Sequence, residues 1–187
     1  MIKNTIKIAL VGQPNVGKSM LINSISNARL KVGNFSGVTV SKEQVFFDYK
    51  NFHIEIVDLP GAYSLNDYTI EEKVTKDFLN NEKYDIILNV LDSTNLQRNL
   101  LLTAELLTLD KKMIIALNMS DEAEKESILI DEIQLSKILG KPCIKTSAAK
   151  KNGITKLLDE ILLKFQSQKV PSKFFFSNVI EKEIENI

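Results

Sequence analysis

Cysteine and histidine are almost absent from this chain, whose 187 residues include one of each, Cys143 and His53. A single cysteine excludes an internal disulfide and fits a reducing compartment, and we expect Cys143 to be a small buried residue. His53 lies in a strand-like run without a Cys or His neighbour, which favours a structural role. The two residues are far apart in sequence and do not indicate a transition-metal site.

An excess of one charge and long apolar runs are lacking as well. Lys and Arg together count 24, as do Asp and Glu, so the formal net charge is zero. This balance does not indicate a chain-wide surface for nucleic acid or anionic membrane. No run approaches the roughly 18 apolar residues of a membrane span, and the N-terminal decapeptide is too polar for a secretory signal. We expect one soluble domain of cytosolic type that does not bind nucleic acid.

Predicted strands and helices alternate along the chain. Residue 28 to residue 37 lacks a clear period and is expected to be a loop, and Lys50–Asn51 is expected to form a hairpin turn. The alternation predicts an α/β fold: a six-stranded, mostly parallel sheet with one antiparallel edge strand and helices on both faces. The expected strands cover 5–11, 39–49, 52–59, 84–92, 112–119 and 142–148, and the expected helices cover 18–26, 69–81, 95–109, a segment ending at 140, and 153–165.

The C-terminal residues follow a different pattern. After Pro171, the apolar residues Phe176, Ile180, Ile184 and Ile187 recur at helical spacing up to the last residue. We expect residues 1–168 to form the α/β domain and residues 169–187 to begin a helical region that continues further.

A phosphate-binding loop is predicted between the first strand and the first helix. Gly12, Gly17, Lys18 and Ser19 match the phosphate-loop pattern in full, and a strand and a helix flank it, which disfavours a chance glycine-rich turn. The glycines let backbone N–H groups face a phosphate, Lys18 supplies positive charge, and the Ser19 hydroxyl suits Mg²⁺. The expected nucleotide-binding residues here are Gly12, Gln13, Pro14, Asn15, Val16, Gly17, Lys18, Ser19 and Met20.

Two later segments indicate that the nucleotide carries guanine. Asn118 and Asp121 stand three apart at the end of a strand, and a carboxylate can accept from both guanine donors, N1–H and the 2-amino group. Adenine lacks that donor pair, so the site would reject it. Met119 is expected to cover the base. The following strand ends in Thr146, Ser147 and Ala148, which resemble the loop whose backbone N–H meets the guanine oxygen.

A third group of residues is predicted to sense the terminal phosphate. Asp58, Leu59, Pro60 and Gly61 end a strand, where Asp58 can hold Mg²⁺ through water and the Gly61 N–H can contact the γ-phosphate. Thr39 can add a second hydroxyl to Mg²⁺, closing its loop only when the γ-phosphate is present. Its alternative is an ordinary strand-edge threonine. These elements together predict a Ras-like phosphate-loop GTPase.

The sequence leaves open how hydrolysis would be catalysed. Ala62 stands where Ras-like enzymes have a water-orienting Gln, and the chain has only two arginines, Arg29 and Arg98. Either the domain is a binding switch with negligible turnover, or the missing charge comes from elsewhere. A K⁺ ion held by the Asn15 side-chain carbonyl could supply it between the β- and γ-phosphates. Alternatively, Asn15 only braces the loop.

Several stretches resemble the N-terminal G domain of the FeoB family, the bacterial ferrous iron transport proteins. They are GQPNVGKS, NFSGVTV, DLPGAYSL, YTIEEKV, LDSTNLQRNLLLT and ALNMSDEA, and the resemblance runs from about Ile6 to Phe165. Gln13, Val16 and Ser19 depart from residues that are frequent in the family, and Ser19 keeps the hydroxyl of the usual Thr.

The resemblance implies a GTP-hydrolysing switch with slow intrinsic turnover, stimulated by K⁺, on the cytoplasmic face of the bacterial inner membrane. Its partners would be GTP or GDP and the membrane-embedded iron-permeation part of the same polypeptide, and a homo-oligomer is left open. The segment from about Pro171 would begin a helical spacer. Backbone groups of Gly37, Val38 and Thr39 would hold the catalytic water, so that the expected catalytic residues are Lys18, Asn15, Gly37, Val38, Thr39 and Gly61.

Two other functions stay open on the residues alone. One is a GTP-gated binding module without useful turnover, favoured by Ala62. The other is a stand-alone soluble GTPase acting on RNA or ribosomes, against which the neutral net charge argues mildly.

Overall fold

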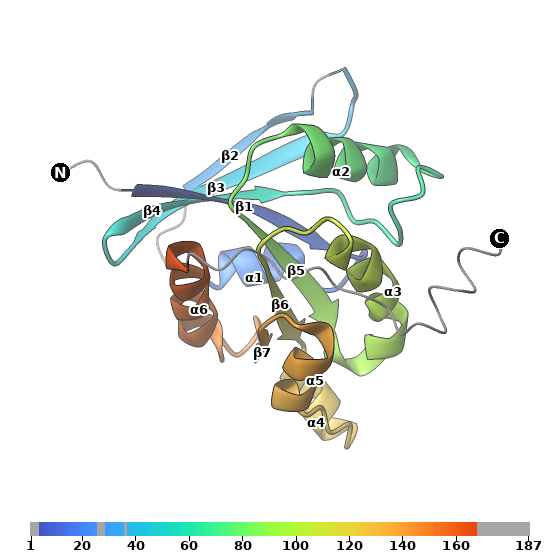
Figure 1. Ribbon diagram of the computed structural model, residues 1–187, viewed down its shortest axis with the longest axis vertical. Helices are drawn as coiled ribbons and strands as arrows, with labels where there is room; N and C mark the ends of the chain where they lie inside the picture. Colours follow the sequence, from blue (N-terminus) through green and yellow to red (C-terminus); the bar gives the residue numbers. More distant parts are fainter. Residues whose placement is uncertain (1–3, 26–28, 36, 168–187) are drawn as a thin grey trace.

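A computed structural model of the chain describes residues 4–25, 29–35 and 37–167 (Figure 1). Its sheet has seven strands in the order β2-β3-β4-β1-β5-β6-β7. The strands are β1 (Asn4–Gly12), β2 (Arg29–Asn34), β3 (Ser41–Tyr49), β4 (Phe52–Asp58), β5 (Ile86–Asp92), β6 (Met113–Asn118) and β7 (Cys143–Lys145). The helices are α1 (Lys18–Asn23), α2 (Ile70–Asn81), the 3₁₀ turn η1 (Ser93–Asn95), α3 (Leu96–Leu107), α4 (Ser120–Lys125), α5 (Glu132–Leu139) and α6 (Ile154–Gln166).

The predicted α/β class is confirmed, but the predicted strand count was one too low. β2 pairs antiparallel with β3, and β3 pairs antiparallel with β4, whereas the other neighbouring strands run parallel. Residues 31–34 of β2 are exposed, and β2 lies at the edge of the sheet. The alternation of polar and apolar residues in β2 covers only Arg29 to Val32 before Gly33 and Asn34 interrupt it, which is too short to indicate a strand.

The core consists of two layers, one on each face of the sheet. Ile8 and Leu10 of β1 point to a layer shared with α1 and α6, while Ala9 and Val11 point to a layer shared with α2, α3 and α5. Both sets are fully buried, which is why β1 reads as a continuous apolar run. Figure 1 shows α1 and α6 on one side of the sheet, with α2 and α3 on the other.

Parallel pairing brings the carboxyl ends of the central strands to one edge of the sheet. The register places Leu10 beside Asp58 and Gly12 beside Val90, and it places Asp92 beside Asn118. Loops that follow these strands therefore gather at one place, the usual ligand position in such sheets.

Two expectations concern the ends and the surroundings of the domain. The proposed helical spacer falls in residues 169–187, which lie outside the described residues. Within the described residues, none of the helices combines the length and the apolar character that crossing a membrane requires.

Candidate nucleotide-binding site

The predicted phosphate loop joins β1 to α1 in a conformation that needs its glycines. Gly17 has φ 85°, and a Cβ atom there would lie 2.5 Å from the Asn118 side-chain nitrogen. At Gly12 a Cβ would lie 2.5 Å from the backbone oxygen of Val90. Asn15 also has a positive φ, 66°, and its side chain is exposed. The loop is therefore held close to β5 and β6 while its rim faces solvent.

Lys18 and Asp58 meet beside this loop. The Lys18 Nζ lies 4.0 Å from the Asp58 Oδ1, and both side chains are largely buried. Burial lowers the pKa of Lys18, an effect that Asp58 opposes. Burial also raises the pKa of Asp58 to about 6, which Lys18 opposes and Glu43 reinforces. The two groups thus carry charge in a site that disfavours it without a ligand.

The same carboxylate fits the Mg²⁺ predicted from the sequence. Asp58 Oδ1 is buried and, among the described residues, has no hydrogen-bond partner. A buried carboxylate oxygen without a partner is costly, and a hard cation or its water would satisfy it. Ser19 is the second residue of α1. It is exposed, so its hydroxyl is accessible to an ion. The donor set therefore fits Mg²⁺.

Asn118 connects the phosphate loop to the base loop. Its side-chain Nδ2 donates to the Val16 carbonyl at 3.0 Å, and its Oδ1 accepts from the Ala148 N–H at 3.1 Å and from the Thr146 hydroxyl at 3.3 Å. The side chain is 1% exposed. This connecting role was not predicted from the sequence. The Ala148 N–H, one of the backbone groups of the loop expected to meet the guanine oxygen, here donates to Asn118.

Asp121 and Met119 flank this connection. A hydrogen bond with Ser147, together with the nearby Lys150 ammonium at 3.5 Å, lowers the pKa of Asp121 and keeps it an acceptor. Met119 has φ 57°, and its methyl carbon would lie 3.5 Å from a Cβ built at Gly17. Met119, predicted to cover a guanine base, therefore lies next to the phosphate loop, while Asp121 is held by the loop after β7.

The segment expected to sense the γ-phosphate runs alongside the phosphate loop. The Leu59 N–H donates to the Leu10 carbonyl at 3.0 Å, and the Ala62 N–H donates to the Gly12 carbonyl at 3.3 Å. A Cβ at Gly61 would lie 3.0 Å from Pro14 backbone atoms, so only glycine fits without a shift. The Gly61 N–H is thus held near the place where terminal phosphates are expected.

The turn between β2 and β3, which contains Thr39 and which we call the first switch, packs against α2 in this structure. Gly37, with φ 76°, and Thr39 are exposed at the turn between β2 and β3. The Phe35 ring packs edge-on against Phe78 of α2, with 6.1 Å between centroids. Val38 lines the groove of about 450 Å³ between this turn and α2. Lys18 and Asp58 are brought together, whereas the Mg²⁺ role of Thr39 stays a prediction.

The Gln13 side chain points away from the nucleotide side of the loop. It is 4% exposed, and its Nε2 donates to the Arg98 carbonyl at the start of α3 at 2.8 Å. The Arg98 guanidinium in turn lies over the Tyr63 ring, 4.8 Å from its centroid. In this structure the Gln13 side chain is therefore engaged with α3. Nothing in the sequence predicts this link, apart from the family-like run that contains Arg98.

Side chains of the types that bind metal ions do not form a cluster in the described part of the chain. There, no group of three or more His, Cys, Asp or Glu side chains could hold a metal ion. Cys143 is buried, as expected, and burial raises its pKa to about 11. His53 Nδ1 forms a 2.8 Å hydrogen bond in which Asp48 Oδ1 accepts, and this fits the structural role predicted for His53.

Comparison with known proteins identifies the family. The family model for ferrous iron transport protein B matches residues 6–161. The Fe(2+) transporter FeoB of Campylobacter jejuni is 53% identical over 96% of this chain, and that of Helicobacter pylori is 58% identical over 91%. The chain covers only 29% and 28% of these two relatives, so it spans less than a third of their length.

Solved structures agree with this assignment. The cytosolic domain of the Thermotoga maritima FeoB iron transporter in a GDP form is 36% identical, with a TM-score of 0.91, covering 98% of this chain and 73% of that one. The FeoB G domain of Methanococcus jannaschii is 39% identical, with a TM-score of 0.77, covering 88% and 99%. The described residues, with their Ras-like sheet and clustered loops, are the G-domain part of such proteins, and the chain belongs to the ferrous iron transport protein B family.

Proposed function

We propose that this chain binds and hydrolyses GTP as a switch domain on the cytoplasmic face of a ferrous iron transporter. The observation that carries the proposal is the Asn118 side chain, which bonds to both the phosphate loop and the base loop. That arrangement fixes the distance between a phosphate cradle and an ionised Asp121, as a guanine nucleotide requires.

Each part of the site has a role in binding. Backbone N–H groups from Gly12 to Ser19 would surround the phosphates, and Lys18 would move its ammonium from Asp58 to the outer phosphates. Asp121 would accept from guanine N1–H and the 2-amino group, while Met119 covers the ring. Ser19, Asp58 and, once its loop closes, Thr39 would hold Mg²⁺, which neutralises phosphate charge when bound.

Hydrolysis would depend on backbone groups more than on a side-chain base. Ala62 is 1% exposed and has no polar side-chain atom, so it cannot orient water. Backbone groups of Gly37, Val38 and Thr39 would position the water after the first switch moves toward the phosphates, and Gly61 would contact the γ-phosphate. Asn15 is exposed on the loop, where its carbonyl could hold an activating K⁺.

The testing experiment compares GTP and ATP hydrolysis in KCl and in NaCl, with Mg²⁺ present. We expect slow turnover of GTP, faster in KCl, little turnover of ATP, and loss of the KCl advantage in Asn15→Ala. Equal rates in the two salts would rule out the K⁺ role. GTP binding without turnover in either salt would instead support a binding module, the function that Ala62 favours.

The link to iron transport rests on the relatives. Their names describe Fe(2+) transporters, and the Thermotoga structure is described as a cytosolic domain. The proposed partner is accordingly a membrane-embedded, iron-permeating part of the same polypeptide.

A further inference from the structure

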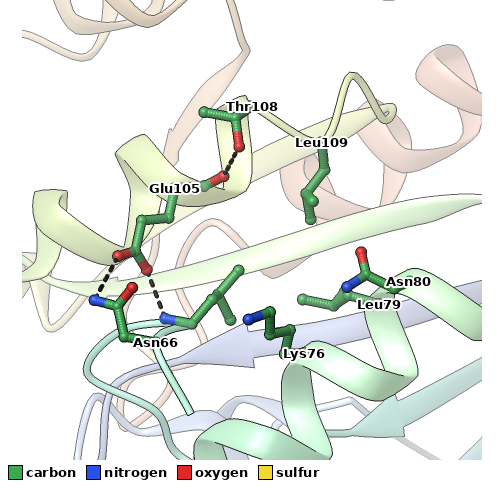
Figure 2. A pocket seen from close by; sticks show the side chains of 8 residues that line it. Asn66, Lys76, Leu79, Asn80, Glu105, Thr108 and Leu109 are labelled. Atoms are coloured by element: carbon green, nitrogen blue, oxygen red, sulfur yellow. Dashed lines mark hydrogen bonds between the residues drawn. The ribbon is translucent and has the colours of Figure 1, made fainter. Parts of the chain in front are cut away.

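The loop that follows Gly61 is bonded to α3 by a single carboxylate. The backbone N–H of Leu65 donates to Glu105 Oε2 at 2.6 Å, and the Asn66 side-chain amide lies 3.5 Å from Glu105 Oε1. Figure 2 shows both contacts at one side of a cavity of about 250 Å³ between this loop, α2 and α3. Because the acceptor is charged, the Leu65 bond belongs to the stronger class of hydrogen bonds.

A second carboxylate holds the same loop from α2. Glu72 accepts from the Ser64 N–H at 3.1 Å and from the Tyr68 N–H at 3.2 Å. α2 begins at Ile70, directly after the loop, and its Phe78 and Leu79 are buried in the core layer that it shares with α3. The bonds to Glu72 therefore join the loop to α2.

The helix that carries Glu105 is fixed to the sheet. The Thr103 hydroxyl donates to Asn89 of β5 at 2.8 Å, with both residues buried. Leu102 and Leu106 of α3 are each 1% exposed in the layer beneath. A bond from Glu105 to the loop thus joins the loop to α3, a second packed helix besides α2.

We infer that Glu105 is a positioning residue for the loop between Gly61 and α2, which we call the second switch. By accepting from the Leu65 N–H, it holds the segment after Gly61 against α3. It thereby supports the position of the Gly61 N–H, which the bonds from Leu59 and Ala62 to β1 hold beside the phosphate loop.

The side-chain hydrogen bonds of Glu105 within the described residues go to Leu65 and Asn66, neither of which is assigned to the nucleotide. The effect of Glu105 on kcat rests on the proposed GTP hydrolysis. The hydrogen bond from the Leu65 N–H to Glu105, which we call the anchor, does not.

Amide hydrogen exchange tests the anchor without any turnover. In the GDP-bound protein, we expect Glu105→Leu to speed exchange of the Leu65 N–H about tenfold or more, since a hydrogen bond to a charged group is lost. Glu105→Gln keeps an acceptor oxygen and should retain most of the protection. Unchanged exchange in Glu105→Leu, or equal exchange in both variants, would overturn the anchor.

Steady-state kinetics test the positioning role. We expect Glu105→Leu to lower kcat for GTP about threefold to tenfold while KM and GDP affinity stay within twofold, and Glu105→Gln to recover most of kcat. Thr108→Ala is the matched control: Thr108 lines the same cavity but bonds to the Glu105 backbone carbonyl, so kcat should not change. Faster Leu65 exchange with unchanged or higher kcat would overturn the inference. Absence of turnover in the unmodified protein would instead refute the proposed function, leaving the exchange result to judge the anchor.

Discussion

At the scale of single residues, some side chains of the candidate site form hydrogen bonds within the protein in addition to the ligand contacts predicted for them. Asn118 was predicted as a base-reading residue, and the structure shows it bonded to Val16, Thr146 and Ala148. A pattern in sequence indicates which residue type stands at a strand end, but it does not show which of several polar groups that residue will meet after folding. The same reason explains why the link from Gln13 to Arg98 was missed.

Asn118→Ala should therefore lower both stability and affinity. Loss of the amide leaves the buried Val16 carbonyl and Ala148 N–H without their partner, at a cost of about 2–4 kcal/mol in the free energy of unfolding. Asp121→Ala is the control, because Asp121 is partly exposed and bonded at the rim. Urea unfolding and GDP titration should show affinity loss in both variants but substantial destabilisation only in Asn118→Ala. Equal stability of the two variants would contradict the connecting role.

Cys143 should be inert toward thiol reagents in the folded protein. Its side chain is 3% exposed, and with a pKa of about 11 it is almost entirely protonated at pH 8, where the reactive thiolate would be needed. A colorimetric thiol assay at pH 8 should show little reaction in buffer and one equivalent of rapid reaction in denaturant. Rapid reaction of the native protein would show that β7 opens readily.

At the scale of elements, strands with buried apolar residues were predicted correctly, whereas short or exposed elements were missed. β1, β5 and β6 have buried, almost continuous apolar runs, and the sequence predicted all three. β2 was not predicted because its alternating residues, Arg29 to Val32, are few and Gly33 and Asn34 follow them directly. α4 is likewise short, with one buried residue, Ala123, and was missed too.

The two faces of α6 should differ sharply in tolerance. Ile161 is fully buried against the sheet, and Ile161→Ala should lower the free energy of unfolding by about 2–4 kcal/mol through lost contacts and a residual cavity. Leu163 is 62% exposed, so Leu163→Ala should change it by about 0.5 kcal/mol or less. Denaturant midpoints would measure both, and GDP affinity should be unaltered. Similar costs at the two positions would contradict the described packing of α6.

At the scale of the whole molecule, binding should be visible as stability. A nucleotide that binds only the folded chain adds about 2.7 kcal/mol at a concentration one hundred times its Kd, which for a domain of this size raises Tm by about 5–10 °C. GDP with Mg²⁺ should produce this shift, and ADP with Mg²⁺ at the same concentration should produce little. Chelation of Mg²⁺ should reduce the GDP shift, because Asp58 then lacks its cation. An equal shift with ADP would refute the reading of Asp121.

The bonds of Asn118 have a consequence for how a nucleotide leaves. The base end and the phosphate end of the site share one buried amide, so we expect opening of one loop to loosen the other. We therefore expect release to be a single concerted opening rather than a stepwise loss from one end. Displacement of the Asn118 side chain would then free both loops at once.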